Sequence, residues 1–203
     1  MRLLLPRKSL RLVLRWTERT LFACAAMFLG YCAFVVVDTW RFQHRETRNL
    51  DRQLQRPVSL LPESLPPNVG SDGLIGRIAI PRLGLSAVVI EGSTALILRR
   101  AVGHIVGTGF AGQAGNIGLA AHRDTFFRPL RNIKLDDIVI LTTLRGEYRY
   151  SVLSTRVVSP SDVAVLNPDG REILTLVTCY PFYFVGPAPQ RFIVRAERLV
   201  NGQ

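Results

Sequence analysis

The run Ile173-Leu174-Thr175-Leu176-Val177-Thr178-Cys179-Tyr180-Pro181 is apolar, rich in β-branched residues, and ends on a cysteine just before Tyr-Pro. Successive side chains of a β-strand point to opposite faces, and both faces of this run are largely apolar, as in a strand at the centre of a sheet. Proline cannot donate to a β-ladder, so the strand is predicted to end beside Pro181. Cys179 is therefore expected at a strand exit, where a side chain is rigidly held and yet reachable.

The residues around this run also predict short strands. Gly, Pro, Asn or Asp turns separate the segments, and Ser93–Ala101 is the best candidate for a short helix. So many short strands indicate a closed or nearly closed barrel or a sandwich, and the pattern does not choose between them. The predicted strands are Leu74–Ile80, Ala87–Ile90, Ile117–Ala121, Ile138–Thr142, Tyr148–Val158, Ile173–Thr178 and Phe192–Leu199.

The charge of the chain is unevenly distributed. The 203 residues carry a formal net charge of +11, of which +7 falls on residues 1–56 and +4 on residues 57–203. Basic clusters bind phosphates, but here the excess lies mainly on both sides of an apolar segment. The later residues contain no Lys/Arg run and no interleaving of basic and aromatic residues of the kind that grips single strands. The composition therefore argues against a nucleic-acid-binding protein.

The apolar segment is Leu21–Val37, seventeen residues without a charge. As a helix it spans about 26 Å, the short end of a bilayer crossing. Six Arg/Lys residues and one Glu precede it, so the positive-inside tendency predicts a cytoplasmic tail at 1–20 and an extracytoplasmic remainder. No small-x-small cleavage site follows and the segment has no polar face. We therefore expect an uncleaved single-pass anchor in the cytoplasmic membrane, not a signal peptide or a surface helix.

Residues 38–72 are predicted to link the membrane segment to a folded domain. Residues 38–56 are highly charged and are expected to form an exposed helix or stalk. Six Pro and Gly residues between 57 and 73 then break any regular element, as in a tether. We place the domain at 73–203.

The domain contains one cysteine. Cys24 and Cys32 lie in the membrane segment, so Cys179 has no partner for an internal disulfide. A lone domain cysteine is an inert core residue, a metal ligand or a nucleophile. The scattered histidines lack the spacing of a metal site, so we expect no metal and no cofactor.

A nucleophilic cysteine needs nearby positive charge and a group that carries protons. His122 closes an apolar run, whereas His104 lies in a glycine-rich stretch where it can simply hydrogen-bond the loop. Arg191 and Arg195 share one face of the last predicted strand. The residue pattern favours His122 modestly and does not choose between the two arginines.

Three segments, taken together and in order, resemble the sortase family, and most of all its class D. They are the TLxTC element at Thr175–Cys179, the Gly-Asn-x-x-x-Ala-x-His-Arg-Asp-Thr-Phe-Phe element at Gly115–Phe127, and Ala188-Pro189-Gln190-Arg191-Phe192-Ile193-Val194. The similarity spans roughly residues 73–199. It implies a mainly β fold, a closed eight-stranded β-barrel with short helices, preceded by one N-terminal transmembrane helix.

The resemblance also implies a membrane-anchored cysteine transpeptidase whose catalytic residues are His122, Cys179 and Arg191. Such an enzyme cleaves an LPxTG-like sorting signal through a thioacyl-enzyme and transfers the surface protein to an amine acceptor from the cell wall or a pilin. Thr178, beside the thiol, is predicted to contact the substrate.

Two other functions are weighed against this one. An L,D-transpeptidase carries a histidine close to its cysteine in a Ser-His-Gly-Cys-type element, and no histidine is near Cys179. A catalytically inactive, membrane-tethered β-domain would bind a peptide partner and would be recognised by loss of the thiol, the imidazole or the guanidinium. All three groups are present.

Overall fold

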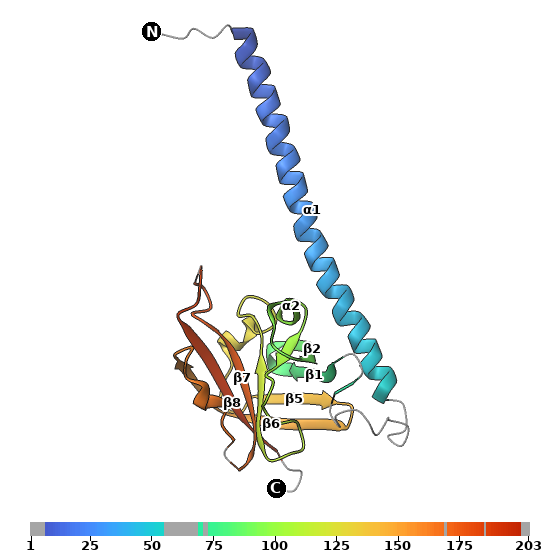
Figure 1. The fold of residues 1–203 in the computed structure, drawn as a ribbon, viewed down its shortest axis with the longest axis vertical. Helices are drawn as coiled ribbons and strands as arrows, with labels where there is room; N and C mark the ends of the chain where they lie inside the picture. The colour runs from blue at the N-terminus through green and yellow to red at the C-terminus, as the bar shows by residue number, and fades with distance from the viewer. Residues whose placement is uncertain (1–6, 55–68, 71–72, 169, 185, 200–203) are drawn as a thin grey trace. The chain divides into compact units, whose positions relative to one another are not determined.

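The computed structural model describes residues 7–54, 69–70, 73–168, 170–184 and 186–199. The chain divides into two compact units, one ending at Arg41 and the other beginning at Phe42. The second unit contains every described strand (Figure 1).

The strands close into a single barrel, as expected from the resemblance. Around the barrel their order is β1-β2-β3-β4-β7-β8-β6-β5. Six neighbouring pairs are antiparallel, and the pairs β2–β3 and β4–β7 are parallel. The strands are β1 (Leu74–Ile80), β2 (Leu85–Glu91), β3 (Val102–His104), β4 (Gly115–Ala120), β5 (Ile138–Thr143), β6 (Gly146–Val158), β7 (Glu172–Tyr180) and β8 (Gln190–Arg198).

Seven of these strands match predicted ones, and β3 is the exception. Two of its three residues, Gly103 and His104, lie in the glycine-rich stretch that was interpreted as a loop. The short elements between strands are α2 (Ala95–Leu98), inside the predicted helix, and the 3₁₀ turns η2 (Pro81–Leu83), η3 (Arg128–Asn132) and η4 (Val163–Leu166).

The barrel interior is filled by alternate residues of each strand, which form one apolar cluster. From β7 the cluster takes Leu174 and Leu176, and from β4 it takes Ile117 and Leu119. The residues between them therefore face outward. Ile173, on the outward face of β7, is nonetheless fully buried.

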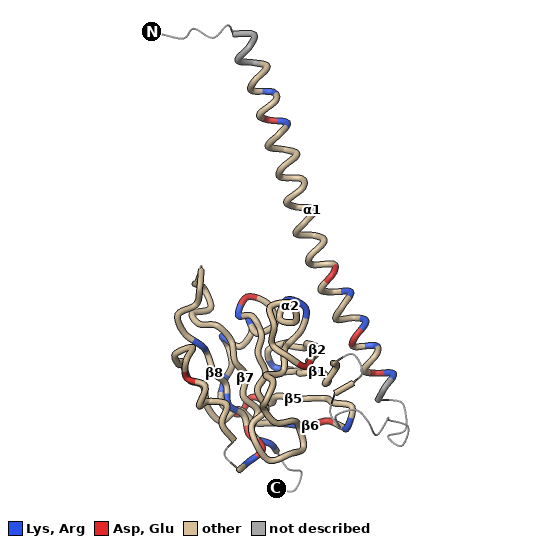
Figure 2. The backbone as a smooth tube through the Cα atoms, viewed as in Figure 1, with Lys and Arg blue, Asp and Glu red and all other residues tan. Residues whose placement is uncertain are grey.

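The N-terminal helix α1 (Arg7–Leu54) is continuous through the predicted membrane segment and into the predicted stalk. Its span Leu12–Arg52 is long and apolar enough to cross a membrane by length and composition, and an 18-residue window within it has a mean hydropathy of 2.2. Figure 2 shows an uncharged central stretch of α1 between charged residues on either side.

The last turns of α1 belong to the barrel unit. Leu50 is fully buried and packs with Leu74 and Val88 in a small cluster on the outside of the barrel. The Gln43 amide donates to the Arg100 carbonyl at 2.6 Å and accepts from the Val88 amide at 2.9 Å. The compact unit thus begins about thirty residues before the domain start placed at 73.

Candidate active site

Strand pairing places Cys179 directly opposite Arg191. The two residues are partners in the antiparallel β7–β8 ladder, near the exit of β7 and the start of β8. Directly opposed residues point to the same face, and here that face is the outside of the barrel because Leu176 and Thr178 alternate inward. Both side chains are half-buried, so a thiol and a guanidinium lie side by side within reach of solvent.

His122 lies on the other side of Cys179. The last paired residues of the parallel β4–β7 ladder are Ala120 and Val177, and the Ala121 amide still donates to the Val177 carbonyl at 3.3 Å. Continuing this register for two residues along both segments sets His122 level with Cys179. By alternation from Ala120, His122 also lies on the outward side.

The three predicted catalytic residues therefore form one row across the rim of the barrel. His122 comes from the end of β4, Cys179 from the end of β7 and Arg191 from the start of β8. They are distant in sequence, and only the closed strand order makes them neighbours.

The turn after His122 is held by a buried aromatic ring. The carbonyl of His122 accepts a hydrogen bond of 3.2 Å from the Phe127 amide, and the Phe127 side chain is fully buried in the core. This bond closes the turn 122–127, so the backbone that carries the imidazole is fixed from the core side.

Thr178, predicted to contact the substrate, is 2% exposed. Its hydroxyl donates to the carbonyl of Ala121 at 2.8 Å, which ties β7 to the residue before His122. The substrate contact remains a prediction, while the geometry gives this hydroxyl a partner inside the protein.

Arg195 and His104 lie away from the row. Arg195 is paired with Thr175, four residues along β8 from Arg191, which is about 13 Å at the rise of a strand. His104 is buried, with Nδ1 at 2.8 Å from the Glu91 carboxylate and Nε2 at 2.9 Å from the Gly109 carbonyl. Both ring nitrogens of His104 are thus engaged within the fold, in keeping with the structural role expected of it.

The buried side-chain amide of Asn116 was not singled out from the sequence. The Asn116 amide donates to the carbonyls of Val165 and Asn167 at 3.0 and 3.3 Å, and its oxygen accepts from the Thr175 hydroxyl at 2.7 Å. These bonds fix the β6–β7 connection over the outer face of β4 and β7. The sequence did contain a signal for this role, because Asn116 is a polar residue in an otherwise apolar run.

Nothing in the described part of the chain gathers three His, Cys, Asp or Glu side chains in a way that could hold a metal ion. The chemistry that the row itself offers is nucleophilic. A thiol flanked by an imidazole and a guanidinium has the groups needed to attack a carbonyl, carry the proton and stabilise the oxyanion.

Several known proteins that match this chain are sortases. A family model described as a sortase domain matches residues 78–199. Sortase D of Bacillus subtilis is 31% identical over 154 residues, covering 75% of this chain and 74% of that protein. The sortase D5 transpeptidase of Clostridium perfringens superposes with a TM-score of 0.69 at 27% identity, covering 79% of this chain and 99% of that one. Sortase C-1 of Actinomyces oris gives 0.59 at 28% identity, covering 64% and 76%. The chain therefore belongs to the sortase family of cysteine transpeptidases, as its motifs predicted.

Proposed function

We propose that this protein cleaves an LPxTG-like sorting signal and transfers the surface protein that carries it to an amine acceptor. The observation that supports this most directly is the row of His122, Cys179 and Arg191 at the barrel rim. Cys179 and Arg191 are paired in one ladder, and His122 follows the last paired residues of the neighbouring ladder.

In the first half-reaction the Cys179 thiolate attacks the carbonyl carbon of the scissile peptide bond. A C–S bond forms, and the carbonyl oxygen becomes an oxyanion that the Arg191 guanidinium stabilises. As the C–N bond breaks, His122 in its imidazolium form gives its proton to the leaving amine. The products are a thioacyl-enzyme and a neutral imidazole.

In the second half-reaction an amine from cell-wall or pilin material attacks the thioester carbonyl. His122 takes the proton of the attacking amine, a new C–N bond forms, and the C–S bond breaks to return the thiolate. Water in place of the amine would release a carboxylic acid, so shielding the thioester from water favours transfer.

Arg191 is suited to the oxyanion because its guanidinium is charged at all working pH values and presents several donors in one plane. Its Nη1 donates to the carbonyls of Ala188 and Gln190 at 3.3 and 3.0 Å. These bonds anchor one edge of the guanidinium to the strand entrance beside Cys179.

The membrane arrangement that accompanies this function follows from α1. The N-terminal basic residues remain in the cytoplasm, the apolar stretch of α1 crosses the membrane, and the barrel lies on the outer side, where sorting signals emerge. The length and apolar composition of the helix support a membrane crossing, and the six basic residues before the apolar stretch support this orientation.

The test uses the full chain in detergent micelles with LPxTG-like peptides and an amine, followed by intact mass spectrometry. Wild type is expected to form an adduct on Cys179 that turns over to an amine-ligated peptide, and Cys179→Ala is expected to form none.

Arg191→Lys is expected to lose about 100-fold in rate, since a lysine lacks the planar set of N–H donors of a guanidinium. Arg195→Lys, on the same face of β8, is the matched control and retains activity. A peptide that binds folded wild type without any adduct would instead identify a binding module.

A pH profile tests the pairing of thiolate and imidazolium. Only the fraction of enzyme with Cys179 deprotonated and His122 protonated is active, so the rate is expected to rise and then fall with pH. A rate that stays flat from about pH 5 to about pH 10 would contradict these roles.

A further inference from the structure

Arg123, the residue after the proposed general acid His122, binds the loop between β7 and β8. Arg123 Nη1 donates to the carbonyl of Pro181 at 2.8 Å, and Nη2 donates to the carbonyls of Phe184 and Gly186 at 2.7 and 3.0 Å. Its guanidinium carbon also lies 5.9 Å from the centre of the Phe184 ring. One side chain thus meets three backbone carbonyls of a single loop.

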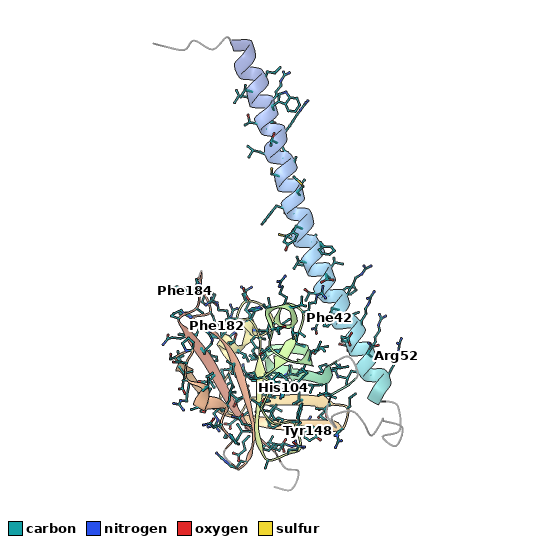
Figure 3. The ribbon with its side chains drawn as sticks, viewed as in Figure 1. Phe42, Arg52, His104, Tyr148, Phe182 and Phe184 are labelled. Atoms are coloured by element: carbon teal, nitrogen blue, oxygen red, sulfur yellow. The ribbon has the colours of Figure 1, made fainter. Side chains whose placement is uncertain are left out.

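That loop joins the strand of Cys179 to the strand of Arg191 (Figure 3, where Phe182 and Phe184 mark it). Its first part is held by ring packing, with the Phe182 and Phe192 ring centres 5.3 Å apart. Arg123 engages a carbonyl on either side of Phe182, that of Pro181 before it and that of Phe184 after it, and also the carbonyl of Gly186.

We propose that Arg123 is a positioning residue for the acyl transfer proposed above, on which this inference rests. It is adjacent in the chain to His122, and its guanidinium binds the segment between the other two members of the row. His122 lies beyond the last ladder bond of β4, so the strands alone do not fix it against Cys179. The Arg123 contacts tie the residue next to His122 to the loop that joins Cys179 to Arg191.

An arginine is required for this arrangement because three acceptors must be met from one planar group. A guanidinium has five N–H donors in a rigid fork, whereas an ammonium is a point charge on a flexible stem. Lysine at this position reaches part of the carbonyl set, and alanine reaches none of it.

Arg131 offers a matched comparison. It reaches the same loop from η3, with Nη1 donating to the Tyr183 hydroxyl at 2.7 Å and its guanidinium 5.5 Å from that ring. Tyr183 is 78% exposed, and Arg131 is itself exposed. Losing this contact leaves the backbone carbonyls of the loop engaged by Arg123.

The experiment compares wild type, Arg123→Ala, Arg123→Lys and Arg131→Ala as full chains in detergent micelles. Amide hydrogen exchange is measured first, because it does not depend on activity. We expect exchange across residues 182–191 to accelerate about tenfold in Arg123→Ala, less in Arg123→Lys, and under twofold in Arg131→Ala, with β1 and β5 unchanged in all. Exchange of Arg123→Ala within twofold of wild type would overturn the proposal.

Steady-state kinetics with the peptide and amine then separate positioning from folding. We expect kcat to fall about 100-fold in Arg123→Ala with a smaller change in KM, and partial recovery in Arg123→Lys. Faster exchange with an unchanged kcat would overturn the positioning role. If wild type itself forms no thioacyl adduct, the proposed function fails, while the exchange data still decide whether Arg123 holds the loop.

Discussion

Replacing Thr178 by valine tests whether β7 holds the residue before His122. The substitution keeps the shape of the side chain and removes the hydroxyl that donates to the Ala121 carbonyl at 2.8 Å. Ala121 and Thr178 are both buried, so water cannot easily replace the lost donor.

The magnitude follows from two opposing effects. A buried carbonyl left without its donor costs about 2 kcal/mol, and a methyl group in place of the buried hydroxyl returns about 0.8 kcal/mol. The free energy of unfolding should therefore fall by about 1 kcal/mol. With a urea dependence of about 2 kcal/mol per molar, the unfolding midpoint moves down by about 0.5 M.

The assay is urea unfolding of residues 42–203. Unfolding is followed by circular dichroism and by amide hydrogen exchange, neither of which needs a tryptophan. Thr178→Ser keeps the hydroxyl and should retain most of the midpoint, whereas Thr155→Val, at an exposed position of β6, should stay within about 0.5 kcal/mol of wild type. If Thr178→Val unfolds at the same urea concentration as Thr155→Val, the bond to Ala121 contributes nothing and the reasoning fails.

Three further substitutions probe the scaffold of the site. Leu50→Ala should lower the free energy of unfolding by about 2 kcal/mol in the same urea assay, because it empties a fully buried position. Arg82 holds the pKa of the buried Asp137 carboxyl below its usual value, so that pair stabilises the fold above about pH 4 and the stabilisation is lost as the pH falls through the lowered pKa. Asp137→Asn should therefore flatten the acid side of a stability–pH curve, and an unchanged slope would contradict this. Gly76→Ala places a Cβ 2.0 Å from the Thr142 carbonyl oxygen and should cost about 3 kcal/mol or prevent soluble expression.

The strands were predictable where local chemistry marks both ends. The predicted Leu74–Ile80 is β1 residue for residue, because a glycine precedes it and a proline follows it. By contrast β3 has only three residues and exists through its pairing with Val89–Glu91 and with β4, which no local pattern reveals. Pairing between distant segments likewise decides between a barrel and a sandwich.

The site was predictable in its parts and not in its geometry. Alternation could not separate Arg191 from Arg195, since both share a face, and only the β7–β8 register sets one of them opposite Cys179. The partners of Arg123 are backbone carbonyls, which every residue possesses, so no side-chain pattern could point to them. Contacts to the main chain become visible only in the folded molecule.

The β-ladders fix Cys179 and Arg191 more firmly than His122, and the additional hydrogen bonds of the site lie around His122. Cys179 and Arg191 are members of one ladder, so their spacing is as firm as the barrel itself. His122 lies past the end of its ladder, and its neighbourhood receives three further supports: the Thr178 hydroxyl on the preceding residue, the Phe127 amide on its own carbonyl, and the Arg123 fork on the facing loop. Because a general acid must meet the leaving amine within hydrogen-bond reach, small shifts of the imidazole slow the reaction more than they weaken the fold. Substitutions around His122 should therefore affect kcat before they affect stability, whereas substitutions within the ladder affect both together.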